Sequence, residues 1–474
     1  MKVFSEPARD IPVRHEADVV VVGGGVSGVC AAIASARAGA NTLLIERYGA
    51  LGGNLTIGLL EASMSFHDRD GKQLIGGIPD EIISRLTREG GSPGHVEDDF
   101  GYAGTVTPYD PEELKMVCLE MVQEAGARLL LHTWVVDAVV QDARLVGLII
   151  ENKSRRQGVA AEVFVDCSGD ADVAALAGVE FSVGRAADGV TQPMSILFKL
   201  GNVDVDGVLS YVFANPSDFK TFGTSLERLR TSRYLHLWGF GKILEAGYAA
   251  GELPFQRSEM HVLVDRPRRE MIINATRFAG DGTKTEDLTK AEIALRRQVK
   301  ALVHYLRKVC PGLGQSYLMS TAMGAQVRET RRIVGEYELN IDDVTKGTAF
   351  PDTIALNHFP CDLHLADSKG METHHTVAHQ IPYRSLVPKK IDGILVAGRC
   401  VSATREALAA IRQTAPAMAM GQAAGTAAAV SVRTSRVRNA RAQPRELPVH
   451  LLQDELRKNR AILPARAVGF DKSR

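Results

Sequence analysis

A glycine-rich turn near the N-terminus is the feature that most constrains the fold of this chain. Gly23, Gly25 and Gly28 form the pattern G-x-G-x-x-G directly after the apolar segment 17–22, which contains four consecutive valines. Such β-branched runs are typical of a parallel strand that is covered on both faces. An alanine-rich segment and a second apolar strand at 42–46 follow, which completes a βαβ unit of about 30 residues. The sequence therefore predicts a dinucleotide site at this turn.

Each glycine of the motif has a separate physical role. The first permits the tight turn, the second lets the backbone approach a pyrophosphate, and the third lets the helix pack closely on the strand. The N–H groups and the positive dipole end of the helix then face the phosphates. We expect five residues of the turn to contact the ligand: Gly23, Gly25, Val26, Ser27 and Gly28. A glycine-rich turn without a nucleotide is the alternative.

Glu46 ends the second strand, where a carboxylate can accept hydrogen bonds from ribose hydroxyls and would repel a 2′-phosphate. This position disfavours NADP. Three further segments, 48–54, 163–172 and 394–399, each combine a strand end or loop with glycines. A ligand that is contacted from so many segments of the sequence is longer than the part of an NAD molecule that one domain binds.

These segments resemble the glutathione-reductase-like two-dinucleotide-binding flavoproteins, and more closely the FAD-dependent oxidoreductases related to succinate dehydrogenase and fumarate reductase flavoproteins. The resemblance spans nearly the whole chain, through 23–28, 46–53, 167–174, 327–335 and 397–425. It implies a noncovalent FAD. It places the segment 398–400 and the helix at Pro416 beside the isoalloxazine, the backbone of Val135 or Val136 at the adenine, and Gly169 with Asp170 near the pyrophosphate and ribitol.

The cofactor contacts expected beyond the first turn follow from this resemblance and from the positions of the glycines. They are Glu46, Arg47, Gly52, Gly53, Asn54, Val136, Ser168, Gly169, Asp170, Gly398, Arg399, Ala415, Pro416 and Met418. Pro416 suits a first helical turn because its φ is fixed and it lacks an N–H that would be unpaired there. A helix N-terminus that points at the flavin would stabilise its anionic reduced form. A plain interior helix is the alternative for this segment.

Candidates for the chemistry are cationic or titratable near neutral pH, because hydride transfer to a flavin needs proton transfer and orientation of the substrate. We expect His375, Arg328, Arg384 and Arg412 to be catalytic, although each arginine could instead form a structural ion pair. His375 belongs to a window with five of the thirteen histidines, residues 358–379. A metal site is disfavoured there because the paired spacing of structural zinc ligands is absent.

Length and composition set the wider expectations. A chain of 474 residues exceeds one ordinary domain. We predict an α/β fold with a Rossmann-like FAD-binding domain (1–60, 111–188 and 385–435) that has a parallel sheet and an inserted β-meander. A mixed α+β substrate or cap domain (61–110 and 189–384) and a C-terminal tail (436–474) complete the chain. The tail is expected to end irregularly.

The charge balance excludes some classes of partner. Lys plus Arg equals Asp plus Glu, so nothing steers the chain toward nucleic acid or anionic lipid. We expect no membrane span, because the most apolar-looking run, 415–430, consists of small residues. The six scattered cysteines and the absence of an apolar N-terminal stretch favour a cytoplasmic protein. A homodimer is possible.

The sequence thus predicts an FAD-dependent dehydrogenase or reductase that transfers a hydride between flavin N5 and a small polar organic substrate. A second glycine motif of equal quality is absent from the sequence, so an external electron acceptor or donor is expected. One alternative is a C=C reductase similar to the enoate and fumarate reductases. The other is a flavin-binding scaffold or sensor without turnover.

Overall fold

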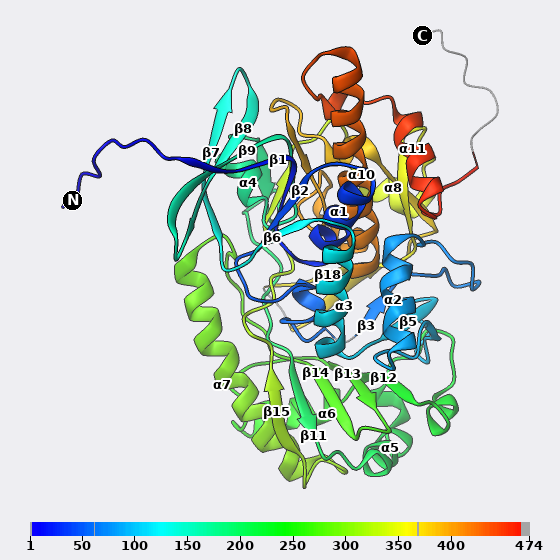
Figure 1. Cartoon of the computed structure of the whole chain (residues 1–474). Helices are drawn as coiled ribbons and strands as arrows, with labels where there is room; N and C mark the ends of the chain where they lie inside the picture. Colours follow the sequence, from blue (N-terminus) through cyan, green and yellow to red (C-terminus); the bar gives the residue numbers. More distant parts are fainter. Residues whose placement is uncertain (1, 61, 367–368, 466–474) are drawn as a thin grey trace.

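A mixed seven-stranded sheet forms one half of the molecule (Figure 1). The computed structural model describes residues 2–60, 62–366 and 369–465. The strand order is β6-β2-β1-β9-β8-β7, and β21 pairs with β9 as well. The strands are β1 (Val13–Val22), β2 (Thr42–Ile45), β6 (Arg128–Leu130), β7 (Trp134–Gln141), β8 (Arg144–Asn152), β9 (Arg155–Asp166) and β21 (Ile394–Val396).

The pairing within this sheet matches the predicted fold class. β1 lies parallel to β2 and β9, β2 to β6, and β21 to β9, whereas β7, β8 and β9 form an antiparallel meander. One edge of β9 pairs with β1. Its other edge pairs with β8 along one part and with β21 along another. The predicted parallel sheet with an inserted meander is confirmed.

The valines of β1 alternate between two cores because successive side chains of a strand point to opposite faces. Val19 and Val21 pack on one face with helices α1 (Val26–Arg37), α2 (Ile78–Arg88), α3 (Pro111–Glu124) and α10 (Thr414–Arg438). Val20 and Val22 pack on the other face with the meander and α4 (Asp172–Leu176). Burial on both faces explains the unbroken apolar run.

Helix α10 lies directly against α1. A Cβ atom on Gly421 or Gly425 would lie 2.0 Å from the carbonyl oxygen of Ser27 or Ala31, respectively. From Thr414 to Val432, every residue of α10 except Ala419 is buried. The small residues of this segment therefore serve close packing between two helices.

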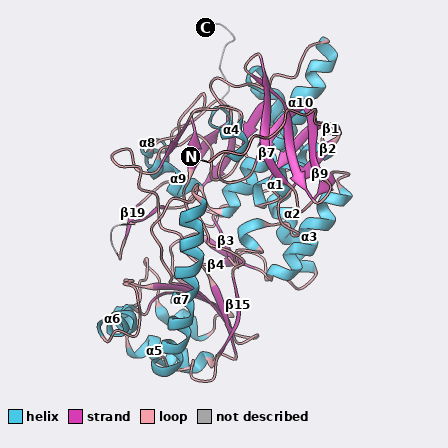
Figure 2. Ribbon diagram, turned by 90° about the vertical axis from the view of Figure 1, so that its left-hand side faces the viewer, coloured by secondary structure: helices cyan, strands magenta, loops and turns pink. Residues whose placement is uncertain are grey.

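A second layer, in the lower half of Figures 1 and 2, contains a five-stranded antiparallel sheet in the order β12-β13-β14-β11-β15. It packs with three helices around its own hydrophobic cluster. The elements are β11 (Phe198–Gly201), β12 (Tyr234–Gly239), β13 (Met260–Asp265), β14 (Glu270–Asn274), β15 (Tyr317–Thr321), α5 (Val205–Ala214), α6 (Gly241–Ala249) and α7 (Thr285–Val309). The division of the chain into an FAD-binding and a cap domain stays a prediction.

Short sheets and helices connect these layers. The pairs are β10 (Phe181–Val183) with β16 (Arg331–Ile333), β17 (Thr353–Asn357) with β20 (His379–Pro382), and β18 (Cys361–His364) with β19 (Met371–His374). A third small sheet has β3 (Ala62–Met64), β5 (Thr105–Pro108) and β4 (Val96–Glu97), and the remaining helices are α8 (Ile341–Lys346), α9 (Arg405–Ile411) and α11 (Val449–Lys458).

The expected irregular end falls on residues 466–474, which lie outside the described residues, but a helix that was not expected lies in the tail before them. Helix α11 lies within it, with Leu452 and Leu456 completely buried beside α10. Two leucines four residues apart share one face of a helix, and this short repeat is the sequence signal for α11.

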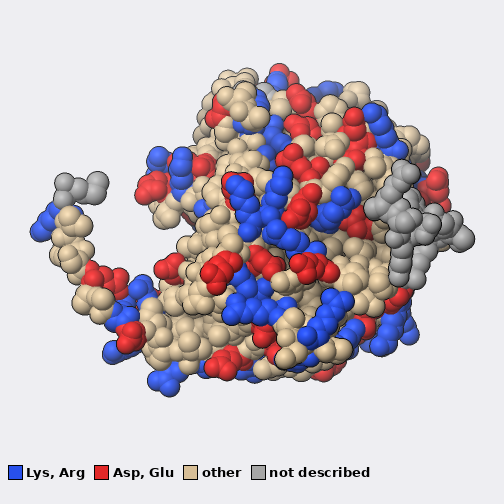
Figure 3. Space-filling model, turned by 90° about the horizontal axis from the view of Figure 1, so that it is seen from above, with Lys and Arg blue, Asp and Glu red and all other residues tan. Residues whose placement is uncertain are grey.

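The surface seen from above carries interspersed basic and acidic side chains (Figure 3). Across residues 2–60, 62–366 and 369–465, every helix is too short or too polar to cross a bilayer. All six cysteines are buried and unpaired. The cytoplasmic location and the homodimer stay predictions.

Candidate functional site

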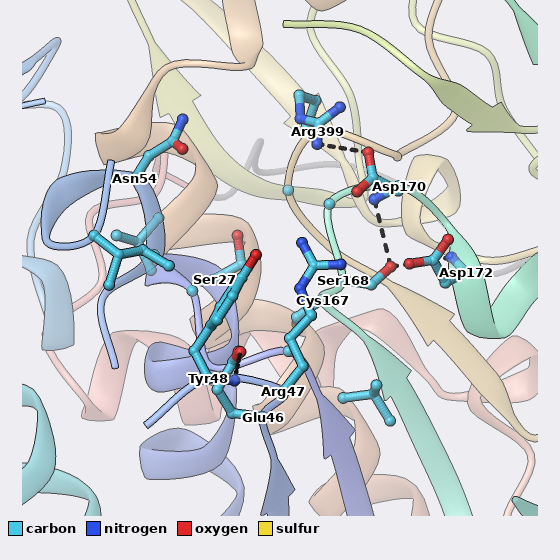
Figure 4. A pocket seen from close by; sticks show the side chains of 18 of the residues that line it. Ser27, Glu46, Arg47, Tyr48, Asn54, Cys167, Ser168, Asp170, Asp172 and Arg399 are labelled. Carbon is cyan, nitrogen blue, oxygen red and sulfur yellow. Dashed lines mark hydrogen bonds and ion pairs between the residues drawn. The ribbon is translucent and has the colours of Figure 1, made fainter. Parts of the chain in front are cut away.

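An elongated cleft runs along the carboxyl ends of β1, β2, β9 and β21, where open α/β sheets bind ligands. Its walls are formed by parts of 22–27, 45–57, 133–135, 167–172, 323–327, 397–399 and 412–417. Figure 4 shows several of these side chains around the space. The glycine turn, Gly169 and the start of α10, which lie far apart in the sequence, meet at this one cleft.

The glycine turn has the geometry that a pyrophosphate site requires. Gly23 has φ +97°, and a Cβ there would lie 2.5 Å from the carbonyl oxygen of Cys167. A Cβ on Gly28 would lie 1.7 Å from the carbonyl oxygen of Gly23, so Gly28 packs behind the cleft wall. Gly25 has no atom within 4 Å of its Cβ position and opens into the cleft as the N-cap of α1, without a side-chain cap. The first N–H groups of α1 are therefore free to bind an anion.

Glu46 is nearly buried at the end of β2. Its Oε2 accepts a hydrogen bond from the N–H of Gly24 at 2.5 Å, and its Oε1 accepts one from Tyr48 at 2.8 Å. Each carboxylate oxygen keeps a second acceptor position. Arg47 lies over the rings of Tyr48 and Trp134, at 5.0 and 5.3 Å from their centroids. These contacts fix both charged residues at one end of the cleft.

The turn after β9 forms the wall in the middle of the cleft. Asp166 is completely buried and accepts hydrogen bonds from the N–H and hydroxyl of Ser168 and from the N–H of Ala174. Burial raises the pKa of Asp166 to about 6. Sequence reasoning did not single out this residue, although its place at a strand end before Ser-Gly-Asp is the signal that could have found it.

Asp170 connects three segments of the cleft wall. Its Oδ1 accepts a hydrogen bond from Arg399 Nη2 at 2.7 Å, which Figure 4 shows, and another from the hydroxyl of Thr330 at 2.8 Å. Gly169 has φ +82°, and its Cβ position lies 3.2 Å from Arg399 Nη2. The guanidinium group of Arg399 therefore occupies the space that a side chain at position 169 would need.

Gly398 closes the next part of the wall, where φ is +95° and a Cβ would lie 2.6 Å from Ser27 Oγ. The start of α10 follows, and Thr414 and Ala417 line the cleft. Ala415, Pro416 and Met418 are buried in the same turn but are not among the lining residues. The helical period puts residues three apart on one face, which explains why their neighbours line the cleft instead.

Three other expected contacts also lie outside the lining of the cleft: Gly28, which packs behind its wall, Val136 and Gly52. Val135 lines it, while Val136 is 37% exposed, because side chains alternate along β7. Gly52, at φ +94°, is also not a lining residue, and its N–H donates to the carbonyl of Gly24 at 2.9 Å. The remaining expected contacts line the cleft: Gly23, Gly25, Val26, Ser27, Glu46, Arg47, Gly53, Asn54, Ser168, Gly169, Asp170, Gly398 and Arg399.

The four candidate catalytic residues separate into two groups. Arg412 lines the cleft beside Thr414, and Arg328 follows directly after the lining residue Val327. Arg384 lies outside the cleft, where its Nε is 3.0 Å from Asp352 Oδ2. His375 is exposed in the loop after β19, also outside the cleft. Neither Arg384 nor His375 is positioned to touch a ligand there.

Of the buried polar residues behind Arg412, Asp362 was missed by sequence reasoning. Asp362 accepts from Arg412 Nη2 through its carbonyl at 3.1 Å, and its Oδ1 lies 3.3 Å from His364 Nε2. Burial lowers the pKa of His364 to about 3. His364 belongs to the five-histidine window, so composition could have included it, but only the packing of β18 shows that it is buried.

The described part of the chain has no group of three or more His, Cys, Asp or Glu residues arranged to hold a metal ion. The groups that could bind a ligand in the cleft are instead the glycine backbone, the carboxylate at the end of a strand and the uncapped start of α1. These groups fit a dinucleotide with a pyrophosphate.

Comparison with protein families gives one match over most of the chain. The family model described as "FAD dependent oxidoreductase" matches residues 18–456. The resemblance that the sequence motifs indicated is thereby confirmed.

Individual relatives are more distant. A dihydrolipoyl dehydrogenase from Trypanosoma brucei brucei is 45% identical over 67 residues, which cover 13% of this chain and 14% of that protein. A geranylgeranyl bacteriochlorophyll reductase-like structure from Thermoplasma acidophilum is 14% identical, with a TM-score of 0.46 over 94% of this chain and 84% of that one. The p-nitrophenol 4-monooxygenase PnpA from Pseudomonas putida DLL-E4 is 10% identical, with a TM-score of 0.45 over 94% and 85%.

Proposed function

Because this chain belongs to the FAD dependent oxidoreductase family, we propose that it binds FAD noncovalently and transfers a hydride between flavin N5 and a small polar organic substrate. The family implies FAD as the cofactor of an enzyme. The noncovalent attachment, the hydride transfer and the substrate class are our proposals. Bound FAD would supply the two-electron chemistry that the side chains of the protein lack.

Residues of the cleft would hold the cofactor along its length. The glycine turn and the uncapped start of α1 would bind the pyrophosphate, and Glu46 would accept hydrogen bonds from the adenosine ribose. The backbone of residues 133–135 would contact the adenine. Gly398 and the first turn of α10 would face the isoalloxazine, where the helix dipole stabilises negative charge.

The observation that best supports an oxidoreductase acting on a polar substrate is the chemistry of the cleft wall at α10. Arg412 lines it, and the Asp362–His364 pair lies directly behind Arg412. A guanidinium group can orient a polar substrate, and the buried Asp362 holds Arg412 in place. The sequence has one dinucleotide motif of this quality, so we further propose an external electron acceptor or donor.

A bleaching screen tests this function. FAD-loaded protein is mixed anaerobically with hydroxy acids, amines, sugars and alcohols, and its visible spectrum is followed. In the reverse direction, chemically reduced protein is mixed with enoates and carbonyl compounds. We expect one class to reduce or reoxidise the flavin at a rate that saturates with concentration.

The matched control is a Gly23→Val variant, which we expect to be colourless because its added side chain collides with Cys167 and its φ is strained. Acid precipitation of the wild type should leave the yellow colour in the supernatant, and colour in the pellet would contradict noncovalent binding. A yellow protein that no compound reduces or reoxidises would instead favour a flavin-binding scaffold.

A further inference from the structure

The five-stranded sheet of the second layer ends in a free edge at β15. In the described part of the chain, β11 is the strand that pairs with β15, and β15 is the last strand of the sheet order. The N–H and C=O groups on its outer side therefore have no strand partner. Natural edge strands often carry a charged residue or a proline that prevents further pairing, but residues 317–321 have neither. The edge can accept another strand.

Three successive side chains of β15 are exposed. The exposed fractions are 53% for Tyr317, 43% for Leu318 and 48% for Met319. The register between β15 and β11 shifts at Met319, which interrupts the usual alternation of side chains between the two faces. Leu318 lies opposite Leu200, a core residue of the cluster that includes the inner side of α7, so both point to the face that α7 covers. The free edge is thus apolar as well as unpaired.

Helix α7 lies beside this edge and carries a row of cations (Figures 1 and 2). Between residues 296 and 308 it has no Asp or Glu. At 3.6 residues per turn, the five cations of this stretch fall within about 120° of the helix circumference, and all are exposed. We call these five residues the basic face: Arg296, Arg297, Lys300, Arg307 and Lys308.

The basic face borders β15 directly and keeps a positive charge. Arg296 donates from Nη1 to the hydroxyl of Thr321 at 3.1 Å and from Nη2 to the carbonyl of Met323 at 3.0 Å. Arg296 and Lys308 pair with carboxylates at 3.2 and 2.6 Å, respectively. The other three cations of the basic face form no ion pair with any described residue. An apolar strand edge therefore lies next to unneutralised positive charge.

We propose that an extended acidic segment of a partner protein adds to β15 as a further strand and places its carboxylates on the basic face. This inference goes beyond the proposed function and does not depend on it. In strand addition, main-chain hydrogen bonds supply affinity and every second side chain supplies specificity. Carboxylates on the α7 side of the added strand would meet the basic face, and apolar side chains on its other side would pack beside Tyr317. Met323 is 58% exposed and lines the cofactor cleft, so the partner would be held beside that cleft.

Other partners match this surface less well. A second copy of the chain that paired through β15 would bring two basic faces together, where like charges repel. A nucleic acid or an anionic membrane would use the basic face but not the main-chain groups of the free edge. An acidic peptide matches both the charge and the unpaired strand.

Synthetic peptides test the proposal. The probe is a fluorescent, acetylated heptapeptide that alternates glutamate with valine, and its binding to FAD-loaded protein is measured by fluorescence anisotropy. One control peptide alternates lysine with valine, and another is the acidic peptide with two adjacent central prolines, which remove N–H groups and prevent strand pairing. We expect saturable binding of the acidic peptide that weakens as ionic strength rises, and at least about tenfold weaker binding of both controls.

A charge-reversal variant identifies the surface. Arg297→Glu combined with Lys300→Glu should weaken binding of the acidic peptide at least about tenfold and strengthen binding of the lysine peptide, because two attractions become repulsions. The matched control combines Arg438→Glu with Arg441→Glu, which are exposed at the far end of α10 and just after it. It changes the net charge by the same amount and should bind both peptides as the wild type does.

Leu318→Glu places a repelling carboxylate on the strand edge and should also weaken binding of the acidic peptide, which keeps the test decisive if the double variant fails to fold. Circular dichroism and FAD content verify folding. Equal binding of the acidic and lysine peptides, equal binding of the proline peptide, or unchanged binding by the double variant would each overturn the proposal. A wild type that ignores the peptides would overturn it too, whether it binds anionic vesicles or duplex DNA through the basic face or dimerises through Leu318.

Discussion

At the scale of single residues, His379 gives a pH-dependent contribution to stability. It is completely buried, with Nδ1 at 2.8 Å from the carbonyl of Val377 and Nε2 at 3.0 Å from the amide nitrogen of Asn357. Burial lowers its pKa to about 4 from an unfolded value of about 6.5. The unfolded chain therefore binds more protons between these values, and the free energy of unfolding falls by about 3 kcal/mol as the pH drops from 6.5 to 4.

The variant His379→Gln tests this linkage. We expect it to be less stable than the wild type at pH 7.5, with the difference shrinking as the pH is lowered to 4.5, because glutamine does not titrate. Urea unfolding at both pH values measures the two free energies. His374→Gln, at an exposed position of β19, is the control and should change neither value. A difference that stays constant with pH would show that His379 does not titrate as described.

More of the expected cofactor residues than of the expected catalytic residues line the cleft, for a physical reason. Glycines such as Gly23 and Gly25 lie on a contiguous strand-turn-helix unit, so their roles follow from local geometry. Asp362 contacts Arg412, which is distant in the sequence, and no local pattern marks it. Arg384 has the right chemistry, but its ion pair with Asp352 places it outside the cleft.

At the scale of elements, the contact between α1 and α10 sets a packing limit. In Gly421→Ala the new methyl group would lie 2.0 Å from the carbonyl oxygen of Ser27, in the first turn of α1. We expect the variant to lose about 1–3 kcal/mol of unfolding free energy and to bind FAD more weakly, because both helices border the cleft. Thermal unfolding and FAD titration measure these effects.

Gly314→Ala is the matched control for that substitution. Its φ is not positive, and the nearest atom to its Cβ position is the carbonyl oxygen of Arg307 at 3.8 Å. It should leave FAD affinity unchanged and stability about the same. If Gly421→Ala behaves like this control, the two helices can separate without cost and the packing argument is wrong.

The elements themselves were largely predictable, because their periodicity is strong. Buried apolar residues of α7 recur every three or four positions, at Leu295, Val299, Leu302 and Leu306, and α3 begins with Pro111 directly after its cap Asp110. The prediction for the start of α10 was less accurate about which residues line the cleft. Pro416 lies in the first turn as expected, but which face of that turn meets the cleft depends on the packing against α1.

At the scale of the whole molecule, Glu329 joins the two halves of the chain. It is completely buried and accepts hydrogen bonds from Arg332 at 2.5 Å, Arg405 at 3.1 Å and the N–H of Gln192 at 3.0 Å. Glu329→Gln would leave two buried guanidinium groups without their carboxylate. We expect a loss of about 3–5 kcal/mol, measured by urea unfolding.

Glu336→Gln is the control for this network, because Glu336 pairs with Arg445 at 3.4 Å near the surface. Exposed pairs contribute at most about 1 kcal/mol, so the control should unfold almost as the wild type does. A similar loss in both variants would show that burial of Glu329 is not what matters. Residues 192, 329 and 405 are too distant in sequence for any pattern to have linked them.

The sharing of one edge of β9 between β8 and β21 has a consequence for synthesis on the ribosome. The first βαβ unit ends at Ile45, and residues 46–393 are translated before β21 and α10. Until then the small-residue face of α1 lacks its covering helix, and the nascent chain cannot enclose a cofactor. The cleft can therefore be completed only after both elements have been synthesised, and a chain truncated before Ile394 would lack β21 and α10.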